Sequence, residues 1–330
     1  MQLCRRDVLK MGIGAGAALA LGRRVLDAAP GLTQEAQLMK AIPSSGERIP
    51  AVGLGTASTF SGAARSPEEH AALREVLRLF TDLGGSVIDT SPSYGRGASE
   101  ETLGELMRNI GNAGEIFMAT KISGAGGRDE GMAQFDRSLE LMSPVTIDLE
   151  QVHNLGDWQT QLPLLRELKQ EGRIRYVGIT TSSDRQYEDL ARILRTEELD
   201  FVQFDYAVDN RNAEEELIPI ARDRGFATLV NGPFGRTRLF SRAGDREVPE
   251  WAHEFGATTW ARFFLKWLLG NDAITVVIPA TSDPDHLRDN MGAGLGRLPN
   301  EDERRRMAAF VDALPPAPRR GRGGRGGGRR

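Results

Sequence analysis

The chain has 330 residues, of which 40% are hydrophobic and 27% charged, and its formal net charge is −4. At this length and hydrophobic fraction the chain can bury a large core. A single cysteine, Cys4, excludes an internal disulfide framework and a cysteine-based metal site. The four histidines have no ligand-like spacing, so we expect no metal site.

The N-terminal segment differs from the body of the chain. It contains Arg5-Arg6, an uncharged Gly/Ala/Leu stretch from Met11 to Gly22 and a second basic pair, Arg23-Arg24. Twin arginines before a short, weakly apolar stretch are typical of a Tat export signal. The stretch is shorter than the roughly 20 apolar residues that a spanning helix needs. We therefore expect residues 1–29 to be a Tat-type signal, recognised by the Tat machinery, on an exported, periplasmic protein with no stable transmembrane span. The alternative is a frayed N-terminal helix on a cytoplasmic protein.

The C-terminal segment also differs from the body. Residues 315–330 are prolines followed by an Arg/Gly repeat, which cannot bury apolar surface, so we expect a disordered tail. The net charge is +3 over residues 1–29 and +6 over residues 319–330, so the body between them carries −13. Such a body does not suit nonspecific nucleic-acid binding, and we expect no nucleic-acid partner. An anionic cofactor would need a local cluster of donors.

Between these ends, strand-like runs alternate with helical patterns. Residues 38–54 alternate around a turn at 44–47, which predicts a β-hairpin ahead of the first barrel strand. Eight strand-like segments lie at 52–55, 84–88, 116–122, 146–153, 174–180, 201–206, 227–230 and 273–279. Helical patterns follow them, at 66–83, 99–110, 129–142, 162–170, 184–196, 213–224, 258–269 and from 283 onward. The alternation predicts an α/β protein, a (β/α)8 TIM barrel over residues 30–314, with an N-terminal β-hairpin closing the barrel bottom.

Four side chains that can move protons lie at the C-terminal ends of successive expected strands. Asp89 and Tyr94 follow the second strand, Lys121 ends the third and His153 ends the fourth. In a parallel barrel these ends converge on one mouth, where the chemistry of such enzymes takes place. The sequence therefore predicts that these four residues form a catalytic group. Because no G-x-G-x-x-G follows a strand, a Rossmann-type nucleotide site is not expected.

Five motifs occur in order along the chain: IPAVGLGT at 49–56, IDTSPSYG at 88–95, ATK at 119–121, VH at 152–153 and IPATSDPDHLRDN at 278–290. With these motifs the chain resembles the aldo-keto reductases across roughly residues 39–313. The resemblance implies an oxidoreductase that reduces aldehyde or ketone carbonyls to alcohols, or performs the reverse oxidation. It implies NADP(H) as cofactor, in preference to NAD(H), and a small carbonyl or alcohol as substrate.

The resemblance also implies roles for the four residues. A tyrosine can protonate the alkoxide left by hydride transfer, but its ordinary pKa of about 10 makes it a weak acid near neutrality. Lys121 would lower the pKa of Tyr94, and Asp89 would balance the charge of the lysine. Tyr94 is then the general acid for reduction and the general base for oxidation. His153 would hydrogen-bond the substrate oxygen and orient it.

Cofactor contacts are implied as well. Asn231 stands where many relatives carry an aromatic residue that stacks on the nicotinamide, so Phe234 or Tyr206 would have to substitute. The loop 232–238 resembles one that folds over the pyrophosphate, with Arg236 or Arg238 supplying charge. His286 stands where relatives often carry an arginine for the 2′-phosphate. The expected cofactor-binding residues are Thr56, Thr180, Thr181, Gln203, Asn231, Phe234, Gly235, Arg236, Thr281, Ser282, His286 and Asn290.

A second interpretation stays open, in which the chain is a nucleotide-binding regulatory or sensor protein on the same fold, with little turnover. The sequence does not define the substrate. Phe60 and Trp158 would suit an apolar wall at the barrel mouth, and they would equally suit ordinary core or surface packing.

Overall fold

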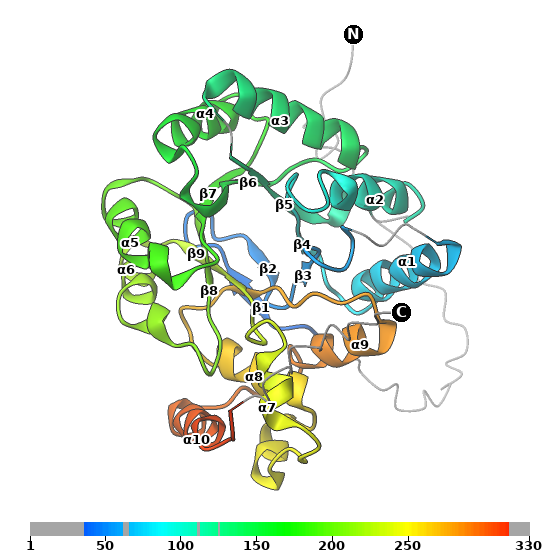
Figure 1. The fold of residues 1–330 in the computed structure, drawn as a ribbon, viewed down its shortest axis with the longest axis vertical. Coiled ribbons are helices and arrows are strands. Elements are labelled where there is room, and N and C mark those ends of the chain that lie inside the picture. Colours follow the sequence, from blue (N-terminus) through cyan, green and yellow to red (C-terminus); the bar gives the residue numbers. More distant parts are fainter. Residues whose placement is uncertain (1–35, 62–65, 111–112, 125, 317–330) are drawn as a thin grey trace, which may run out of the picture. The chain divides into compact units, whose positions relative to one another are not determined.

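Eight short parallel strands form the centre of the fold and are hydrogen-bonded in chain order (Figure 1). The computed structural model describes residues 36–61, 66–110, 113–124 and 126–316, so the expected signal at 1–29 and residues 317–330 of the expected tail lie outside the described residues. The strands are β3 (Leu54–Gly55), β4 (Val87–Asp89), β5 (Phe117–Ile122), β6 (Leu149–Val152), β7 (Tyr176–Thr180), β8 (Phe201–Asp205), β9 (Ala227–Asn231) and β10 (Val276–Val277).

Contacts between the first and last strands close the sheet into a barrel. Parallel bridges join Val52 to Val277 and Gly55 to Ala280. At this seam the Gly55 amide donates to the Pro279 carbonyl at 3.0 Å. A Cβ on Gly55 would lie only 2.8 Å from the Ile278 carbonyl oxygen, so the close approach requires glycine. The predicted (β/α)8 barrel is confirmed.

Helices surround the strands in Figure 1. Each of the first six barrel strands is followed by one of α1 (Pro67–Asp82), α2 (Ala98–Met107), α3 (Arg128–Met142), α4 (Trp158–Gln170), α5 (Tyr187–Thr196) and α6 (Leu217–Arg224). The later helices are α7 (Arg238–Ala243), α8 (Trp260–Leu269), α9 (Pro284–Gly292) and α10 (Glu301–Asp312). Single 3-10 turns are η1 (Ala113–Glu115), η2 (His153–Leu155), η3 (Asp184–Gln186) and η4 (Asn212–Glu214), and η5 (Glu250–Phe255) is a longer 3-10 helix.

The start of α1 shows how local sequence sets a helix. The Ser66 hydroxyl accepts a hydrogen bond from the Glu69 amide at 3.1 Å, and Pro67 occupies the first turn, where it costs no hydrogen bond. The helix buries Leu73, Val76 and other residues at helical spacing, as the sequence predicts.

Two details depart from the sequence-based expectation. The helices expected at 184–196 and 213–224 each begin with a separate 3-10 turn, η3 and η4. Between β9 and α8 the chain forms α7 and η5, where no helix was expected. Each of these elements has six residues, which span at most about two helical turns, so each carries too few apolar positions to show a periodic pattern.

The N-terminal hairpin closes the bottom of the barrel. β1 (Met39–Ala41) pairs with β2 (Arg48–Pro50) in antiparallel register. Ile49 of β2 and Ile42, which follows β1, pack in one buried cluster with residues of the barrel strands and with Ile278, which follows β10; the strand residues are Val87, Phe117, Ala119, Leu149, Tyr176, Phe201, Ala227, Leu229 and Val276. This apolar cluster, called the barrel floor below, confirms the predicted closing hairpin.

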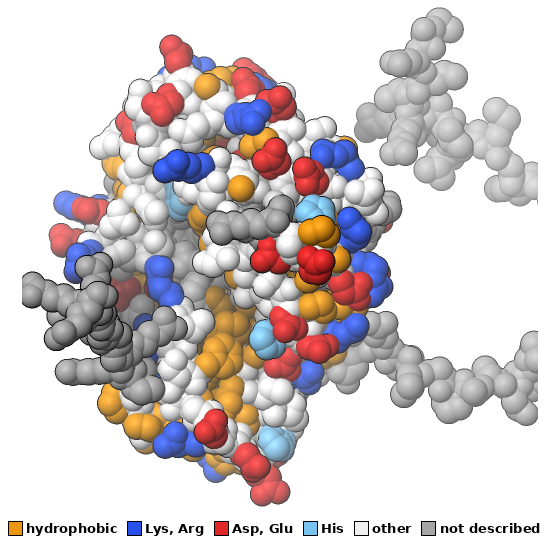
Figure 2. Space-filling model, turned by 45° about the vertical axis from the view of Figure 1, so that its right-hand side comes forward, with side chains coloured by type: hydrophobic (Ala, Val, Ile, Leu, Met, Phe, Trp, Pro, Cys, Tyr) orange, Lys and Arg blue, Asp and Glu red, His pale blue; other side chains and the backbone are white. Residues whose placement is uncertain are grey.

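Acidic and basic side chains intermingle over the face drawn in Figure 2. Many of them pair; for example, Arg78 contacts Glu75 at 2.6 Å. Exposed pairs of this kind each contribute little to stability. Within the described ranges no helix combines the length and apolar character needed to cross a membrane. Those ranges also hold no group of three or more His, Cys, Asp or Glu side chains able to hold a metal ion.

Candidate active site

The side chains that point into the barrel change character along each strand. On β5, Phe117 and Ala119 belong to the apolar floor, whereas Lys121, two residues further on, lines a cavity at the mouth. On β7 the same two-residue steps lead from Tyr176 in the floor to Thr180 in the cavity. Because successive side chains of a strand point to opposite faces, these alternate positions share the barrel interior.

The cavity at the mouth has a volume of about 640 Å³ and brings the four predicted catalytic residues together. It is lined by Gly55, Thr56, Ala57, Ser58, Thr59, Asp89, Tyr94, Lys121, His153, Asn154, Thr180, Ser182, Gln203, Asn231, Gly232, Pro233, Phe234, Arg236, Thr237, Ile278 and Ala280. A volume of this size lies in the range of small-molecule and cofactor sites.

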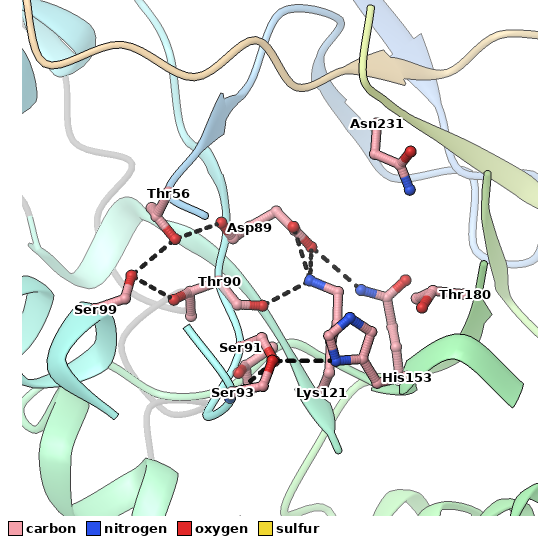
Figure 3. A network of polar contacts seen from close by, with 12 residues as sticks. Thr56, Asp89, Thr90, Ser91, Ser93, Ser99, Lys121, His153, Thr180 and Asn231 are labelled. Carbon is pink, nitrogen blue, oxygen red and sulfur yellow. Dashed lines mark hydrogen bonds and ion pairs between the residues drawn. The ribbon is translucent and has the colours of Figure 1, made fainter. Parts of the chain in front are cut away.

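Lys121 and Asp89 form a buried ion pair beneath the cavity (Figure 3). The ammonium nitrogen of Lys121 donates to both carboxylate oxygens of Asp89, at 2.9 and 2.8 Å, and to the Thr90 carbonyl at 2.6 Å. Each side chain is no more than 3% exposed. Burial alone would lower the pKa of Lys121, but the Asp89 carboxylate and Tyr94 oppose this, and the net pKa shift is upward. Lys121 therefore stays charged.

Tyr94 lies in the turn that follows β4, beside this ion pair. The ammonium nitrogen of Lys121 lies 5.2 Å from the centre of the Tyr94 ring, and the His153 ring meets Tyr94 edge-on at 6.0 Å. Burial raises the pKa of Tyr94, and although Lys121 pulls it down, the net shift is upward. The sequence predicts a lowered Tyr94 pKa from the charge of Lys121 alone. In the folded protein, desolvation of the phenol changes the Tyr94 pKa more than Lys121 does, so the net shift is upward.

His153 follows β6 and is held at one ring nitrogen by serines. Its Nδ1 lies 2.6 Å from the Ser123 hydroxyl, 3.2 Å from that of Ser91 and 3.5 Å from that of Ser93. Burial, with a smaller contribution from the charge of Lys121, lowers the pKa of His153 to about 3. The imidazole is therefore neutral at physiological pH, so it carries one ring proton and not two.

Six of the expected cofactor residues line the same cavity: Thr56, Thr180, Gln203, Asn231, Phe234 and Arg236. The side chain of Gln203 is nearly fully buried, and its Oε1 has no hydrogen-bond partner within the described residues. A buried amide oxygen without a partner, on a side chain that lines the cavity, favours a ligand that carries an N–H donor. The carboxamide of a nicotinamide is such a donor, so this position fits the cofactor that the sequence predicts.

The loop after β9 bends sharply over the cavity. Arg236 and Thr237 have φ angles of 54° and 73°, in the left-handed region that glycine favours. Arg236 is well exposed and donates to the Ser182 carbonyl at 2.9 Å. Arg238, the other expected source of charge, is engaged in a two-pronged pair with Asp209, at 2.7 and 2.8 Å. Arg236 is thus the arginine of this loop that faces the cavity.

The other six expected cofactor residues do not line this cavity: Thr181, Gly235, Thr281, Ser282, His286 and Asn290. Thr181 follows the last inward position of β7, and its hydroxyl donates to Gln186 at 2.7 Å. At the start of α9 the Asp283 carboxylate accepts from the amides of Asp285 and His286, at 2.8 and 3.3 Å, so it caps that helix.

Of the two aromatic residues proposed to replace the missing stacking partner, only Phe234 lines the cavity. Tyr206 is fully buried and packs on Trp267, with the ring centres 5.2 Å apart. Phe60 is fully buried in the main core, and neither it nor Trp158 lines the cavity. Phe60 and Trp158 therefore do not form an apolar wall of this cavity.

Several residues of the site are not predicted from the sequence. Ser123 contacts His153, while Asn154 and Ser182 line the cavity and hydrogen-bond each other at 3.1 and 3.2 Å. Asn154 has a φ of 52°, which asparagine tolerates better than most residues. Their position offered a signal, because each follows within two residues of a predicted strand-end site residue.

Comparison with known proteins indicates the same family as the sequence motifs do. A model of the Aldo/keto reductase family matches residues 51–309, well over half of the chain. The chain is 28% identical over 210 residues to the aldo-keto reductase YhdN of Bacillus subtilis, covering 60% of this chain but only 62% of that relative. It is 25% identical to the methylglyoxal reductase YeaE of Escherichia coli, covering 85% of this chain and 96% of the relative.

A solved structure shows the same fold. It is an aldo/keto reductase of Klebsiella pneumoniae in complex with NADP and acetate, with a TM-score of 0.68, 20% identity and coverage of 86% of this chain and 97% of that chain. The closed barrel, the four side chains at its mouth and the family match agree, and the chain belongs to the aldo/keto reductase family.

Proposed function

We propose that this protein is an NADP(H)-dependent oxidoreductase that reduces aldehyde or ketone carbonyls to alcohols, or catalyses the reverse reaction, with Tyr94 as general acid and base. The observation that carries the proposal is the convergence of Tyr94, the Lys121–Asp89 pair and neutral His153 on one cavity. In the second interpretation, a nucleotide sensor, nothing requires a charged lysine buried beside a tyrosine.

Each of the four residues has a task that its surroundings support. Burial raises the pKa of Tyr94, so the hydroxyl is protonated at neutral pH, and the nearby charge of Lys121 offsets part of that rise and makes the phenol a stronger acid than burial alone would leave it. Lys121 favours the phenolate that remains after this transfer, since its charge lies 5.2 Å from the ring centre. Asp89 keeps Lys121 protonated, and His153 offers a neutral ring nitrogen to the substrate oxygen.

The cofactor assignment follows from the residues that line the cavity. When bound, NADPH supplies the hydride that reduces the carbonyl carbon. Gln203 would accept from the carboxamide, Phe234 would pack on the ring, and Arg236 would pair with the pyrophosphate. The NADP complex of the Klebsiella pneumoniae relative supports NADP(H) for this chain as well.

Replacing Tyr94 with phenylalanine tests the proposal. We expect kcat for carbonyl reduction, followed by NADPH absorbance across a panel of aldehydes and ketones in both directions, to fall by about 10²- to 10⁴-fold, the range for a lost general acid. The dissociation constant for NADPH, measured by fluorescence, should change little. Wild-type turnover below detection with intact NADPH binding would favour the sensor interpretation, and an active Tyr94→Phe enzyme would exclude the acid role.

We also propose export, on the twin-arginine segment at residues 1–29. A Tat substrate crosses the membrane folded, so the cofactor can be loaded in the cytoplasm, and the enzyme would leave with tightly held nucleotide. Purification from a periplasmic fraction, followed by release and quantification of bound nucleotide, tests this. Protein found only in the cytoplasm would contradict export, and an empty periplasmic enzyme would contradict the retained cofactor.

A further inference from the structure

Three serine hydroxyls lie near one ring nitrogen of His153, and two of these serines, Ser91 and Ser93, are labelled beside the ring in Figure 3. Ser123, Ser91 and Ser93 lie 2.6, 3.2 and 3.5 Å from Nδ1. Ser91 and Ser93 follow β4, Ser123 follows β5, and His153 follows β6, so three strand ends meet at this atom. The short contact with Ser123 makes it the principal partner of the nitrogen.

The backbone of Ser123 is fixed by a side chain from the outer helix layer. Its amide donates to Oε1 of Gln134 on α3 at 2.9 Å, and its carbonyl accepts from Nε2 of the same side chain at 3.0 Å. This double contact holds the backbone of Ser123, from which its hydroxyl reaches Nδ1 of His153 at 2.6 Å. The arrangement fits a group that orients the imidazole rather than one that merely fills space.

The serine hydroxyls form a connected cluster beside this nitrogen. The backbone amide of Ser93 donates to the Ser91 hydroxyl at 3.2 Å. The Ser91 hydroxyl lies 2.9 Å from that of Ser93 and 3.0 Å from that of Ser123, which in turn lies 2.6 Å from Nδ1. Each hydroxyl carries one proton, so Ser91 can donate to Ser123 while Ser123 donates to Nδ1 of His153.

We propose that Ser123, supported by Ser91, is a positioning residue that sets the tautomer of His153: Nδ1 accepts from Ser123, and the single ring proton sits on Nε2. An Nε2–H group donates a hydrogen bond to a carbonyl oxygen at the mouth, whereas the opposite tautomer would present a lone pair to that oxygen and repel it. The consequence for catalysis rests on the proposed carbonyl reduction. The assignment of the tautomer does not depend on that reaction.

The tautomer can be observed directly. We would record long-range ¹H–¹⁵N correlation spectra of the full-length protein labelled at histidine, with the His153 signals identified by their absence in His153→Gln. In the wild type at pH 7 we expect a protonated Nε2 and an unprotonated Nδ1. A protonated Nδ1 would overturn the proposal, and this reading does not depend on any serine variant folding.

Variants of Ser123 link the tautomer to the rate. In Ser123→Ala we expect a mixture of tautomers and a kcat for carbonyl reduction about tenfold lower, which is the effect of one lost hydrogen bond, with a smaller change in KM. Ser123→Thr, which keeps the hydroxyl, should restore both. The matched control is Ser45→Ala at the opposite end of the barrel, where the hydroxyl lies 2.8 Å from that of Tyr176, and it should change neither.

The outcomes separate this inference from the proposed function. A wild-type tautomer and rate in Ser123→Ala would overturn the role of Ser123. A wild-type protein with the Nε2–H tautomer but no carbonyl reduction would remove the proposed function and leave the assignment of the tautomer intact. A change of tautomer in Ser45→Ala would show that the ring responds to any loss of a serine, which would also overturn the role of Ser123.

Discussion

The two ends of the barrel interior are built from the same strands but differ in the character of their inward side chains. At the floor, Phe117, Tyr176 and Phe201 pack together with ring centres 5.5 to 5.8 Å apart, and the space is filled with apolar groups. Two or four residues further along these strands, the inward side chains are Lys121, Thr180 and Gln203. The floor contributes burial, and the mouth holds charges and unpaired polar atoms that cost stability and serve a ligand.

The largest effect should come from breaking the buried ion pair at the mouth. Lys121→Met leaves the Asp89 carboxylate buried without its partner, so we expect kcat to fall by about 10²- to 10⁴-fold and the free energy of unfolding to fall by about 3–5 kcal/mol. Steady-state kinetics and urea denaturation measure the two effects.

A double variant sharpens this prediction. Lys121→Met combined with Asp89→Leu removes both charges, and apolar replacement of a buried pair is often neutral or stabilising. Stability should therefore recover while activity stays lost. Recovery of activity together with stability would contradict a chemical role for Lys121.

Replacing a residue of the barrel floor should have the opposite result, a large loss of stability with little loss of activity. Phe201→Ala removes a fully buried ring that packs on Phe117 and Tyr176, so we expect the free energy of unfolding to fall by about 3–5 kcal/mol. Well below the melting temperature, kcat and the dissociation constant for NADPH should stay near wild type, because no catalytic group moves. Phe201→Leu, which keeps most of the volume, should cost less. A large loss of kcat in the folded alanine variant would show that the two ends are coupled.

The smallest effect concerns a buried acid outside the barrel interior. Glu150 lies on β6 between the inward residues, is 1% exposed, and neither of its carboxylate oxygens has a partner within the described residues. Burial, together with the nearby Glu100, raises the pKa of Glu150 well above its ordinary value. The native state therefore holds a proton that the unfolded state loses above about pH 4.5, so this contribution to stability is complete below that pH and declines as pH rises.

Glu150→Gln should remove this decline. We expect the free energy of unfolding of the variant to depend less steeply on pH above pH 4.5, by at most about 1.4 kcal/mol per pH unit, the value for one proton. Urea denaturation at a series of pH values measures the slope. Glu140→Gln, at a residue whose side chain is 71% exposed, is the control and should leave the slope unchanged. An unchanged slope in Glu150→Gln would mean that the buried carboxyl is already ionised.

The barrel and the four side chains at its mouth could be predicted from the sequence because each signal is local. The strand ends at Asp89 and Lys121 follow mainly apolar runs, His153 follows a segment in which apolar and polar residues are mixed, and parallel strands bring such ends together. The pairing of Arg238 with Asp209 could not be predicted, because it joins separate loops whose geometry no periodic pattern encodes. The sign of the Tyr94 pKa shift also depends on burial, which only the fold defines.

The alternation of side chains along a strand explains why one of the expected cofactor residues does not line the cavity. Thr180 and Thr181 are adjacent and chemically alike, yet only Thr180 lines the cavity, because neighbouring side chains of a strand face opposite ways. Counting in steps of two from Tyr176 would have separated them. The roles of Thr281, Ser282, His286 and Asn290 stay predictions.

The seam between β3 and β10 has a consequence for motion. These two strands have two residues each, against six in β5, and three backbone hydrogen bonds join the segments across the seam, from Gly53 to Val277, from Gly55 to Pro279 and from Val277 to Ala51. Local opening begins where backbone pairing is sparse. We therefore expect the barrel to breathe at this seam, beside Thr56 and Ile278, while the strands carrying Lys121 and His153 stay closed. Such breathing would change the width of the cavity without disturbing the residues that carry out the chemistry.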